Sequence, residues 1–421
     1  MAGGEIVVIG AGHNGLVAAA YLARAGRSVL VLERRSLVGG TATTEEMAPG
    51  FRCSPYFPGA ELFDLRIVRD LRLRRHGLEL LPRRGGVFLP QLEGNCLLVG
   101  AGDGAGTPHG GAVAAAAGRS GAPALRTAAE AVARASPADA AALAAVEGFM
   151  QRLAGALEPV FAAPLPDLDG SAASGKLDLL RLGWRLRRLG RDSMREAIRY
   201  LPMAIGDLLE ERFQSQGLKA AIAATGLTGS WLGPCAAGSA FALLYHGRGS
   251  AGIFGLPRFV RGGLGALSNA LADAARAAGA ELRTGAAVAR IKVKDGSARG
   301  LVLASGEEVE ARVVVSNADP CSTLLGLVDP LQLSPEIVTA AANIRARGSL
   351  AVVALALDGL PHFSGAPAGE AHLAGRLQIG ASLEALERAF DDGKHGRLPA
   401  RPVLDCTLPS IVDPSLVPAG K

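Results

Sequence analysis

The distribution of apolar residues near the amino terminus predicts a strand, a turn, a helix and a second strand in close succession. Residues 6–9 form a short β-branched run, which is typical of a strand buried on both faces. Residues 16–25 favour a helix, and residues 29–32 form a second apolar run. The pattern therefore predicts that an α/β fold of the Rossmann-like kind begins at the amino terminus.

Two later stretches have the spacing of amphipathic helices. Residues 61–73 carry apolar side chains at i, i+3 and i+4. In residues 176–191, leucines at 179, 182, 186 and 189 form one row, and arginines at 181, 185 and 188 lie opposite. One interpretation is a packed helix with a solvated basic side. The other is a contact with a membrane surface, through which a lipophilic substrate could enter.

The middle of the chain alternates between helical and strand patterns. Residues 220–245 carry no charge, but several glycines and Pro234 interrupt them, which favours a buried helix, turn and helix over a membrane span. A helix is expected from Leu264, followed by a strand at 281–284 and a three-stranded meander over 288–315, with turns at Asp295-Gly296 and Ser305-Gly306. Residues 350–357 are a further strand candidate, and the Gly- and Ala-rich residues 100–121 are expected to be a mobile insertion.

Composition limits the class of protein. A chain of 421 residues with 49% hydrophobic residues predicts a globular protein of two domains. Its net charge of +5 comes from 44 basic and 39 acidic residues spread along the chain, which is no nucleic-acid footprint. Among the five cysteines the closest pair, Cys53 and Cys96, is 43 positions apart, so a local redox disulfide and a zinc-finger spacing are excluded. The seven histidines show no metal-ligand spacing, and no metal site is expected.

A glycine-rich turn follows the first predicted strand and carries the chemistry. Gly10, Gly12 and Gly15, with Ala11, His13 and Asn14 between them, form the GxGxxG fingerprint. The first glycine allows a tight turn, the second lets a pyrophosphate approach the backbone, and the third lets the helix pack on the sheet. Glu33 closes the second strand, where a carboxylate can accept hydrogen bonds from a ribose diol.

The residues after Glu33 discriminate between dinucleotides. Gly39, Gly40 and Thr41 suggest a second close backbone approach to the same cofactor, which favours FAD over a nicotinamide. Arg34 and Arg35 either neutralise cofactor phosphates or are exposed charges at a strand end. Two alternatives to an FAD-dependent oxidoreductase stay open: an NAD(P)-dependent dehydrogenase, and a non-catalytic binding protein on the same fold. No catalytic side chain is identified, although Tyr245-His246 is a candidate polar pair facing a substrate.

The runs GAGHNGLVAAAYLARAG and VLERRSLVGGTATTEEMAPGF resemble the phytoene desaturase-like flavoproteins. The resemblance returns at 262–268, at 315–318 and from Arg401 to Lys421. It implies a fold of the glutathione reductase/amine oxidase type with a discontinuous α+β substrate domain. It further implies that the backbone of Val288 meets the adenine, and that a hydrophobic small molecule is oxidised by hydride transfer or desaturation. A mitochondrial matrix location is also implied, although no presequence is visible and the cytoplasm is the alternative.

The resemblance also divides the chain. Residues 1–78 and 255–319 are expected to form the FAD-binding domain, and residues 79–254 and 320–421 the substrate domain. Family members carry a second glycine-rich stretch beyond the position of Lys421. The chain is therefore expected to be a fragment, or a product that has lost this segment.

Overall fold

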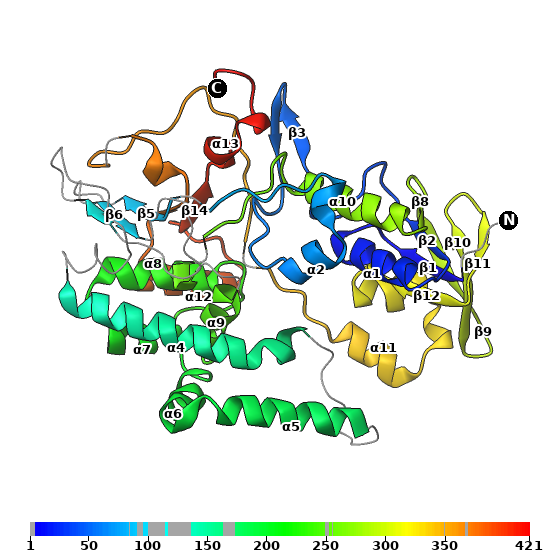
Figure 1. Ribbon diagram of the computed structural model, residues 1–421, viewed down its shortest axis with the longest axis horizontal. Helices are drawn as coiled ribbons and strands as arrows, with labels where there is room; N and C mark the ends of the chain where they lie inside the picture. The colour runs from blue at the N-terminus through cyan, green and yellow to red at the C-terminus, as the bar shows by residue number, and fades with distance from the viewer. Residues whose placement is uncertain are drawn as a thin grey trace.

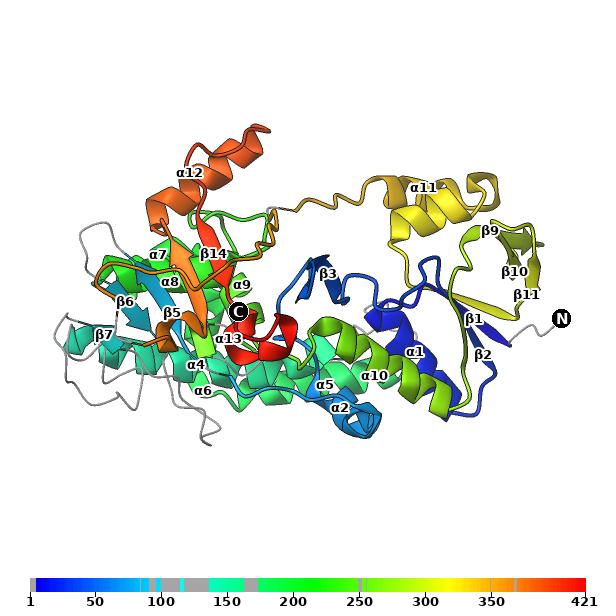
Figure 2. The same ribbon diagram turned by 90° about the horizontal axis from the view of Figure 1, so that it is seen from above.

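The computed structural model describes residues 5–83, 85–90, 96–99, 114–116, 136–162, 173–248, 252–254, 256–348, 350–366 and 369–421. Two parts lie side by side along the long axis of the molecule (Figures 1 and 2). One part holds the amino terminus and the glycine-rich turn, and the other holds a second sheet covered by helices. The predicted insertion at 100–121 lies outside the described residues, apart from residues 114–116.

The first part contains a parallel sheet whose strands run in the order β12-β1-β2-β8. These strands are β1 (Ile6–Ile9), β2 (Val29–Leu32), β8 (Glu281–Arg283) and β12 (Val313–Ser316). Helices α1 (His13–Arg24) and α10 (Leu264–Ala277) cover one face. The predicted antiparallel meander covers the other as β9 (Val288–Lys294), β10 (Ser297–Leu303) and β11 (Glu308–Glu310).

Side-chain alternation explains why β1 and β2 are apolar at every position. Ile6 and Val8 point into the core with the two helices, whereas Val7 and Ile9 point into the core with the meander. A strand covered on both faces has no solvent side on which polar residues would be favoured. The Rossmann-like α/β fold predicted from the apolar runs is therefore confirmed.

The second part is built on a mixed sheet in the order β14-β13-β5-β6-β7. Its strands are β5 (Val87–Pro90), β6 (Cys96–Val99), β7 (Ala114–Ala116), β13 (Arg376–Ile379) and β14 (Leu404–Thr407). Only the β13–β5 pair is parallel. The helices of this part are α4 (Pro137–Ala162), α5 (Ala173–Arg187), α6 (Gly190–Tyr200), α7 (Ile205–Arg212), α8 (Gln216–Leu227), α9 (Ser239–Gly247), α12 (Leu383–Lys394) and α13 (Pro409–Val412).

Residues 220–245 form the predicted buried helix, turn and helix. They fall in α8 and α9, whose side chains join the main core of the second part with those of α4 and α7. Within the described part of the chain, no helix has the length and apolar character that a membrane crossing requires. The glycines and Pro234 end α8 early and turn the chain back, which is why this uncharged run does not form one long helix.

Shorter elements complete the described chain. They are the hairpin β3 (Glu45–Ala48) and β4 (Phe51–Cys53), helices α2 (Leu65–Asp70) and α11 (Pro335–Ala342), and single turns at Leu73–His76, Gly252–Phe254, Ser322–Leu327, Pro330–Gln332, Ala371–Leu373 and Pro414–Leu416. Val328 still packs under the sheet of the first part. The domain boundaries at 78, 254 and 319 stay a prediction.

Two sequence-based expectations were wrong in detail. The helix expected at 61–73 is only α2, because Asp64 caps its start through Arg66 N (2.8 Å) and Arg72 turns left-handed after its end. Residues 350–357 form no strand but an extended connection between α11 and the second sheet. Val353 is 78% exposed there, since no strand of the described chain lies alongside to accept its backbone hydrogen bonds.

Candidate functional site

The glycine-rich turn begins directly after β1. Gly10 has a φ of 90°, a left-handed conformation that suits glycine, and its N–H donates to Leu32 O (2.7 Å). Gly12 is the N-cap of α1 and accepts the first helical hydrogen bond, from Leu16 N (2.9 Å). No side chain of the described residues caps this helix, and its first turn carries no acidic residue. The partial positive charge at the start of α1 is thus left available to an anion.

The predicted second backbone approach lies directly against this turn. Gly39 N donates to Ala11 O (2.8 Å), and Gly12 and Gly39 form a parallel bridge. A Cβ built on Gly40 would lie 3.1 Å from the Cα of Gly12. Glycines on both sides therefore form a cradle of bare backbone, which side chains would fill.

Glu33 is held in place at the mouth of the cradle. Its side chain is buried, with 7% of the residue exposed. One carboxylate oxygen accepts Ala11 N (2.8 Å) and the other accepts Arg35 N (2.9 Å). Because each carboxylate oxygen has two acceptor positions, Glu33 can still accept a ribose hydroxyl.

The other residues predicted to bind the cofactor differ in their exposure and in their partners. Arg34, Asn14 and Thr41 are exposed. Arg35 pairs with Glu45 (2.8 Å), and this hydrogen bond raises the pKa of Arg35 and lowers that of Glu45. Arg34 is thus exposed at the strand end and Arg35 faces a protein carboxylate, while a role of either in neutralising cofactor phosphates stays a prediction. Burial lowers the pKa of His13, which favours its neutral form beside the helix terminus.

Val288, whose backbone the resemblance places at the adenine, follows a segment that is bonded to the end of β2. Gly285 N donates to Arg35 O (3.0 Å) and Ala286 N donates to Glu33 O (2.8 Å). These bonds place the start of β9 beside Glu33. The role of the Val288 backbone in contacting adenine stays a prediction.

Asn317 lies against the turn. The resemblance covers it at 315–318, but it was not among the residues predicted to bind the cofactor. It follows β12, and its N–H donates to Ile9 O (2.8 Å) at the end of β1. Its side chain packs on the turn, since a Cβ on Gly15 would lie 3.1 Å from the Asn317 Cβ. A polar residue directly after a strand that pairs with β1 was the signal that could have revealed it.

Ser268 and Thr44 were also missed. Ser268 Oγ donates to Ala42 O (2.6 Å), and Thr44 Oγ1 accepts Gly265 N (2.9 Å), so the segment after Gly40 is fixed to α10. Ser54 Oγ accepts Leu264 N (3.0 Å). The start of α10 is therefore capped by protein side chains, whereas that of α1 is not. Both α1 and α10 begin directly after a glycine, and α1 is the one whose first backbone N–H groups are left available to a ligand.

Polar groups also gather between the parts, near the predicted Tyr245-His246 pair. Arg376 forms a largely buried ion pair with Asp405, which accepts Thr228 Oγ1 (3.2 Å). Burial, followed by the charges of Arg376 and Arg248, lowers the pKa of His246. Burial likewise raises the pKa of Glu61. Titratable groups with shifted pKa values thus gather near the predicted pair.

The first part fits FAD. The bare-backbone cradle and the uncapped start of α1 suit a diphosphate, and buried Glu33 suits a ribose. No group of three or more potential His, Cys, Asp or Glu ligands gathers among the described residues. Residues Gly10–Gly15, Glu33 and Gly39–Gly40 would hold the dinucleotide.

Comparison with known proteins agrees with this geometry. Residues 8–60 match the NAD(P)-binding Rossmann-like domain, and residues 130–383 match the flavin containing amine oxidoreductase family. The chain is 35% identical to rat pyridine nucleotide-disulfide oxidoreductase domain-containing protein 2 over 437 residues, covering 99% of this chain and 71% of that protein. It is 30% identical to hydroxyneurosporene desaturase of Cereibacter sphaeroides over 332 residues, covering 76% and 57%.

Among solved structures, an oxidoreductase from Methanosarcina mazei is similar, with 18% identity and a TM-score of 0.46. The match covers 80% of this chain and 64% of that chain. The family matches and the relatives, with the flavin that the family name specifies, support FAD as the cofactor. The chain belongs to the flavin-containing amine oxidoreductase family.

Proposed function

We propose that the protein is an FAD-dependent oxidoreductase that removes a hydride from, or desaturates, a hydrophobic small molecule. The observation that carries the proposal is the cradle of Gly12 and Gly40 beside the uncapped start of α1, with Glu33 buried at its mouth. The similarity to a desaturase whose name specifies hydroxyneurosporene supports a hydrophobic substrate.

Each part of the chain has a defined role in this proposal. The N–H groups at the start of α1 bind the diphosphate, and Glu33 orients the ribose. Bound FAD would supply the hydride acceptor, so this chain would need to supply binding and orientation more than reactive side chains. The buried helices α8 and α9 exclude water from the substrate. The polar cluster of Arg376, Asp405 and His246 orients a polar group of the substrate.

A nicotinamide enzyme is the second candidate, because residues 8–60 match a family described as NAD(P)-binding. Glu33 accepts ribose hydroxyls equally well in NAD. The two candidates differ in colour, since oxidised flavin absorbs visible light and NAD does not.

A location of the protein in the mitochondrial matrix is a proposal that rests on the resemblance alone.

Two measurements test the proposal. The absorption spectrum of the purified chain should show oxidised flavin bands, or gain them when FAD is added. Titration calorimetry with FAD, NAD and NADP should give the strongest binding for FAD. Binding of a nicotinamide alone would favour the second candidate, and binding of none of the three would favour a non-catalytic protein.

Gly12→Ala is the matched variant. Its methyl group would overlap the Asn317 side chain and fill the cradle. We expect FAD affinity to fall by at least about tenfold, roughly 1.4 kcal/mol. Gly155→Ala is the control, because a Cβ at Gly155 in α4 meets no atom within 4 Å. Equal FAD affinity in the two variants would place the binding site elsewhere.

A further inference from the structure

Helix α5 carries apolar side chains on the face that points away from the molecule. Leu177, Leu180 and Trp184 are 54%, 70% and 59% exposed. Their spacing of three and then four residues places them in one row along the helix. The leucine row predicted to pack, at 179, 182, 186 and 189, is a different one. Its last three members are partly buried, but Leu179 is 39% exposed, contrary to the prediction. The helix therefore has two apolar rows, of which only one is directed into the protein.

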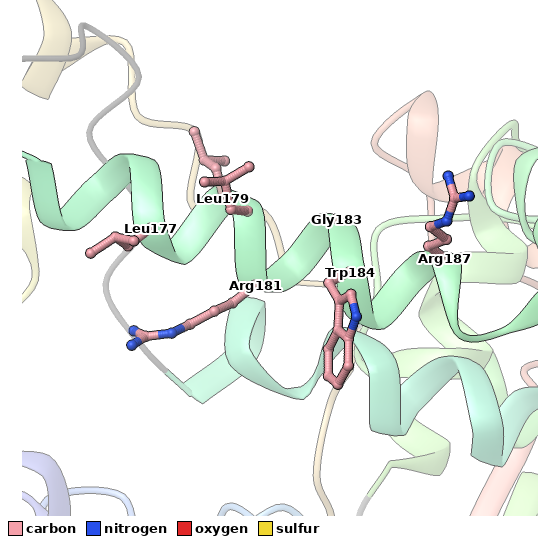
Figure 3. A pocket seen from close by; sticks show the side chains of 7 residues that line it. Leu177, Leu179, Arg181, Gly183, Trp184 and Arg187 are labelled. Carbon is pink, nitrogen blue, oxygen red and sulfur yellow. The ribbon is translucent and has the colours of Figure 1, made fainter.

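No other described element covers the outer row. An open hollow of about 570 Å³ lies along it, and all of the residues that line this hollow belong to α5, between Leu177 and Arg187. In Figure 1, α5 lies at the edge of the molecule, outside α4. Arg181 and Trp184 leave the helix on one side in Figure 3. Exposed apolar surface of this kind marks a place where a protein meets another phase or partner.

The charges on and near α5 indicate what that partner is. Arg181, Arg187 and Arg188 flank the outer row, and the guanidinium of Arg188 lies 4.5 Å from the ring centre of Trp184. Residues 173–200 contain eight basic and three acidic residues, a net charge of +5. The whole chain also has a net charge of +5. The excess positive charge of the protein is thus equal to that of this one segment.

Helix α6 follows α5 and carries a similar arrangement. Ile198 is exposed between Arg195 and Arg199, so an apolar side chain again lies among arginines. A row of leucine and tryptophan bordered by arginine is the arrangement of helices that lie in the interface of an anionic bilayer. The apolar side chains enter the boundary of the acyl chains, and the guanidinium groups bind the lipid phosphates.

We propose that α5, supported by α6, docks the protein on the surface of an anionic lipid bilayer. The proposal does not depend on the proposed oxidoreductase activity, because it concerns a surface remote from the dinucleotide cradle. If both hold, the docked helix brings the second part of the molecule to a phase in which hydrophobic substrates dissolve.

Vesicle co-sedimentation of the full chain is the first test. We expect binding to phosphatidylglycerol vesicles, much weaker binding to phosphatidylcholine vesicles, and release at high salt. Replacing Arg181, Arg185 and Arg188 by glutamate should lower the vesicle-bound fraction at least about tenfold. Leu180→Ser with Trp184→Ser should also lower it. Leu398→Ser and Arg312→Glu, both exposed on other surfaces, are the controls and should not.

Tryptophan fluorescence is the second test. The chain has two tryptophans, Trp184 and Trp231, so Trp231→Phe leaves Trp184 as the only reporter. Its emission should shift to the blue when phosphatidylglycerol vesicles are added, and brominated lipids should quench it. Unchanged emission, or equal sedimentation of the glutamate variant and the parent chain, would overturn the proposal. Concentration-dependent dimerisation that the α5 variants abolish, without vesicle binding, would assign the face to a second copy instead.

Discussion

At the scale of single residues, Glu33 links the turn to the second strand. Its two oxygens accept N–H groups from Ala11 and Arg35, one on each side of the cradle. The sequence predicted its position from the end of β2, because a local pattern was sufficient. Asn317 and Ser268 could not be found in this way, since their partners Ile9 and Ala42 lie more than 200 positions away and no local periodicity records such contacts.

Glu33→Gln tests this residue. The amide group must present an N–H to one of the two backbone donors, so one of these hydrogen bonds is lost. We expect a loss of about 1–3 kcal/mol in the free energy of unfolding and weaker FAD binding. Chemical denaturation and calorimetric titration measure the two effects. Glu310→Gln, at an exposed position of β11, is the control; equal behaviour of the two variants would contradict the prediction.

Glu147 in α4 should make the stability of the folded protein depend on pH. Burial raises its pKa to about 7, and a backbone hydrogen bond from Ile253 offsets this only in part. The folded protein therefore keeps the proton above the ordinary pKa of 4.5, at which the unfolded chain loses it. Stability due to this group is complete below pH 4.5 and declines as the pH rises to about 7.

Glu147→Gln should remove this decline. The variant should have a higher melting temperature than the parent chain at pH 8 and a similar one at pH 4.5, because glutamine is neutral at both. The expected gain at pH 8 is on the order of 2 kcal/mol. Thermal scans at the two pH values test this prediction. Glu310→Gln, at an exposed position, is the control. A gain of the same size at both pH values would show a packing effect and not a titration.

At the scale of elements, hydrophobic periodicity predicted the strands and helices whose burial leaves a pattern in their own sequence. The runs at β1 and β2 and the meander were found because burial on two faces, or tight Gly turns, leave a signal in each segment alone. The meander was predicted to reach residue 315, but it ends at Glu310, because residues 313–316 pair with β1 as β12. Residues 350–357 have the same strand composition, yet a strand also requires a neighbour, and the described chain supplies none. The outer row of α5 was missed because the inner leucine row has the same period.

The extended segment at 350–357 should promote aggregation. Val353 and Leu355 expose apolar side chains on unpaired backbone, which is a template for strand pairing between molecules. Val353→Lys with Leu355→Lys should slow aggregation, as measured by light scattering at raised temperature. The melting temperature should change little, since neither side chain is buried. Ile344→Lys, at another exposed apolar position, is the control, and equal slowing by that variant would point to net charge alone.

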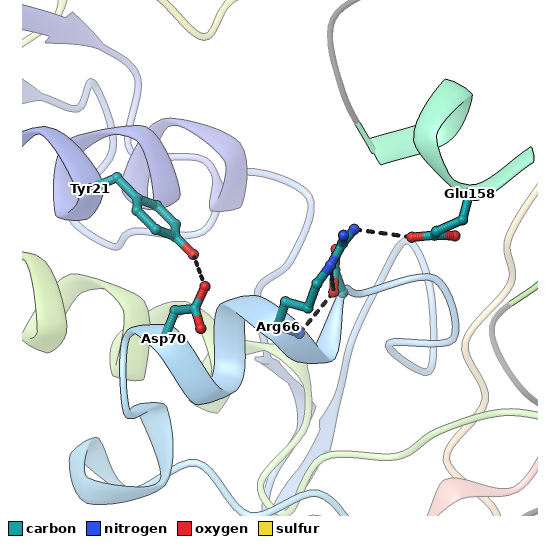
Figure 4. A network of polar contacts seen from close by, with 5 residues as sticks. Tyr21, Arg66, Asp70 and Glu158 are labelled. Carbon is teal, nitrogen blue, oxygen red and sulfur yellow. Dashed lines mark hydrogen bonds and ion pairs between the residues drawn. The ribbon is translucent and has the colours of Figure 1, made fainter. Parts of the chain in front are cut away.

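At the scale of the whole molecule, an ion pair between α2 and α4 joins the two parts. Arg66 of α2 pairs with Asp64 (2.5 Å) and with Glu158 of α4 (3.0 Å) (Figure 4). The nearby hydrogen bond from Tyr21 to Asp70 (3.2 Å) joins α1 to α2 within the first part. The side chains of Arg66 and Glu158 are about half exposed. Solvent screens such pairs, so the contact orders the two parts more than it stabilises them.

A double-mutant cycle measures this contact. Arg66→Ala and Glu158→Ala, singly and together, should give a coupling energy below about 1 kcal/mol. Urea denaturation supplies the four free energies of unfolding. A coupling of several kcal/mol would show that the two parts depend on this ion pair for their arrangement, contrary to our expectation.

The strand order of the two sheets has a consequence for synthesis on the ribosome. The first sheet needs β8 and β12, which follow residue 280, and the second needs β13, which lies between β5 and β14 and begins at Arg376. The first sheet therefore cannot be completed before residues 313–316 have been translated, nor the second before residues 404–407. Until then β1, β2 and β5 expose surfaces that are apolar on both sides, and long-range pairing of this kind is slow. The nascent chain should thus depend on chaperones that hold these apolar segments until their partner strands have been translated.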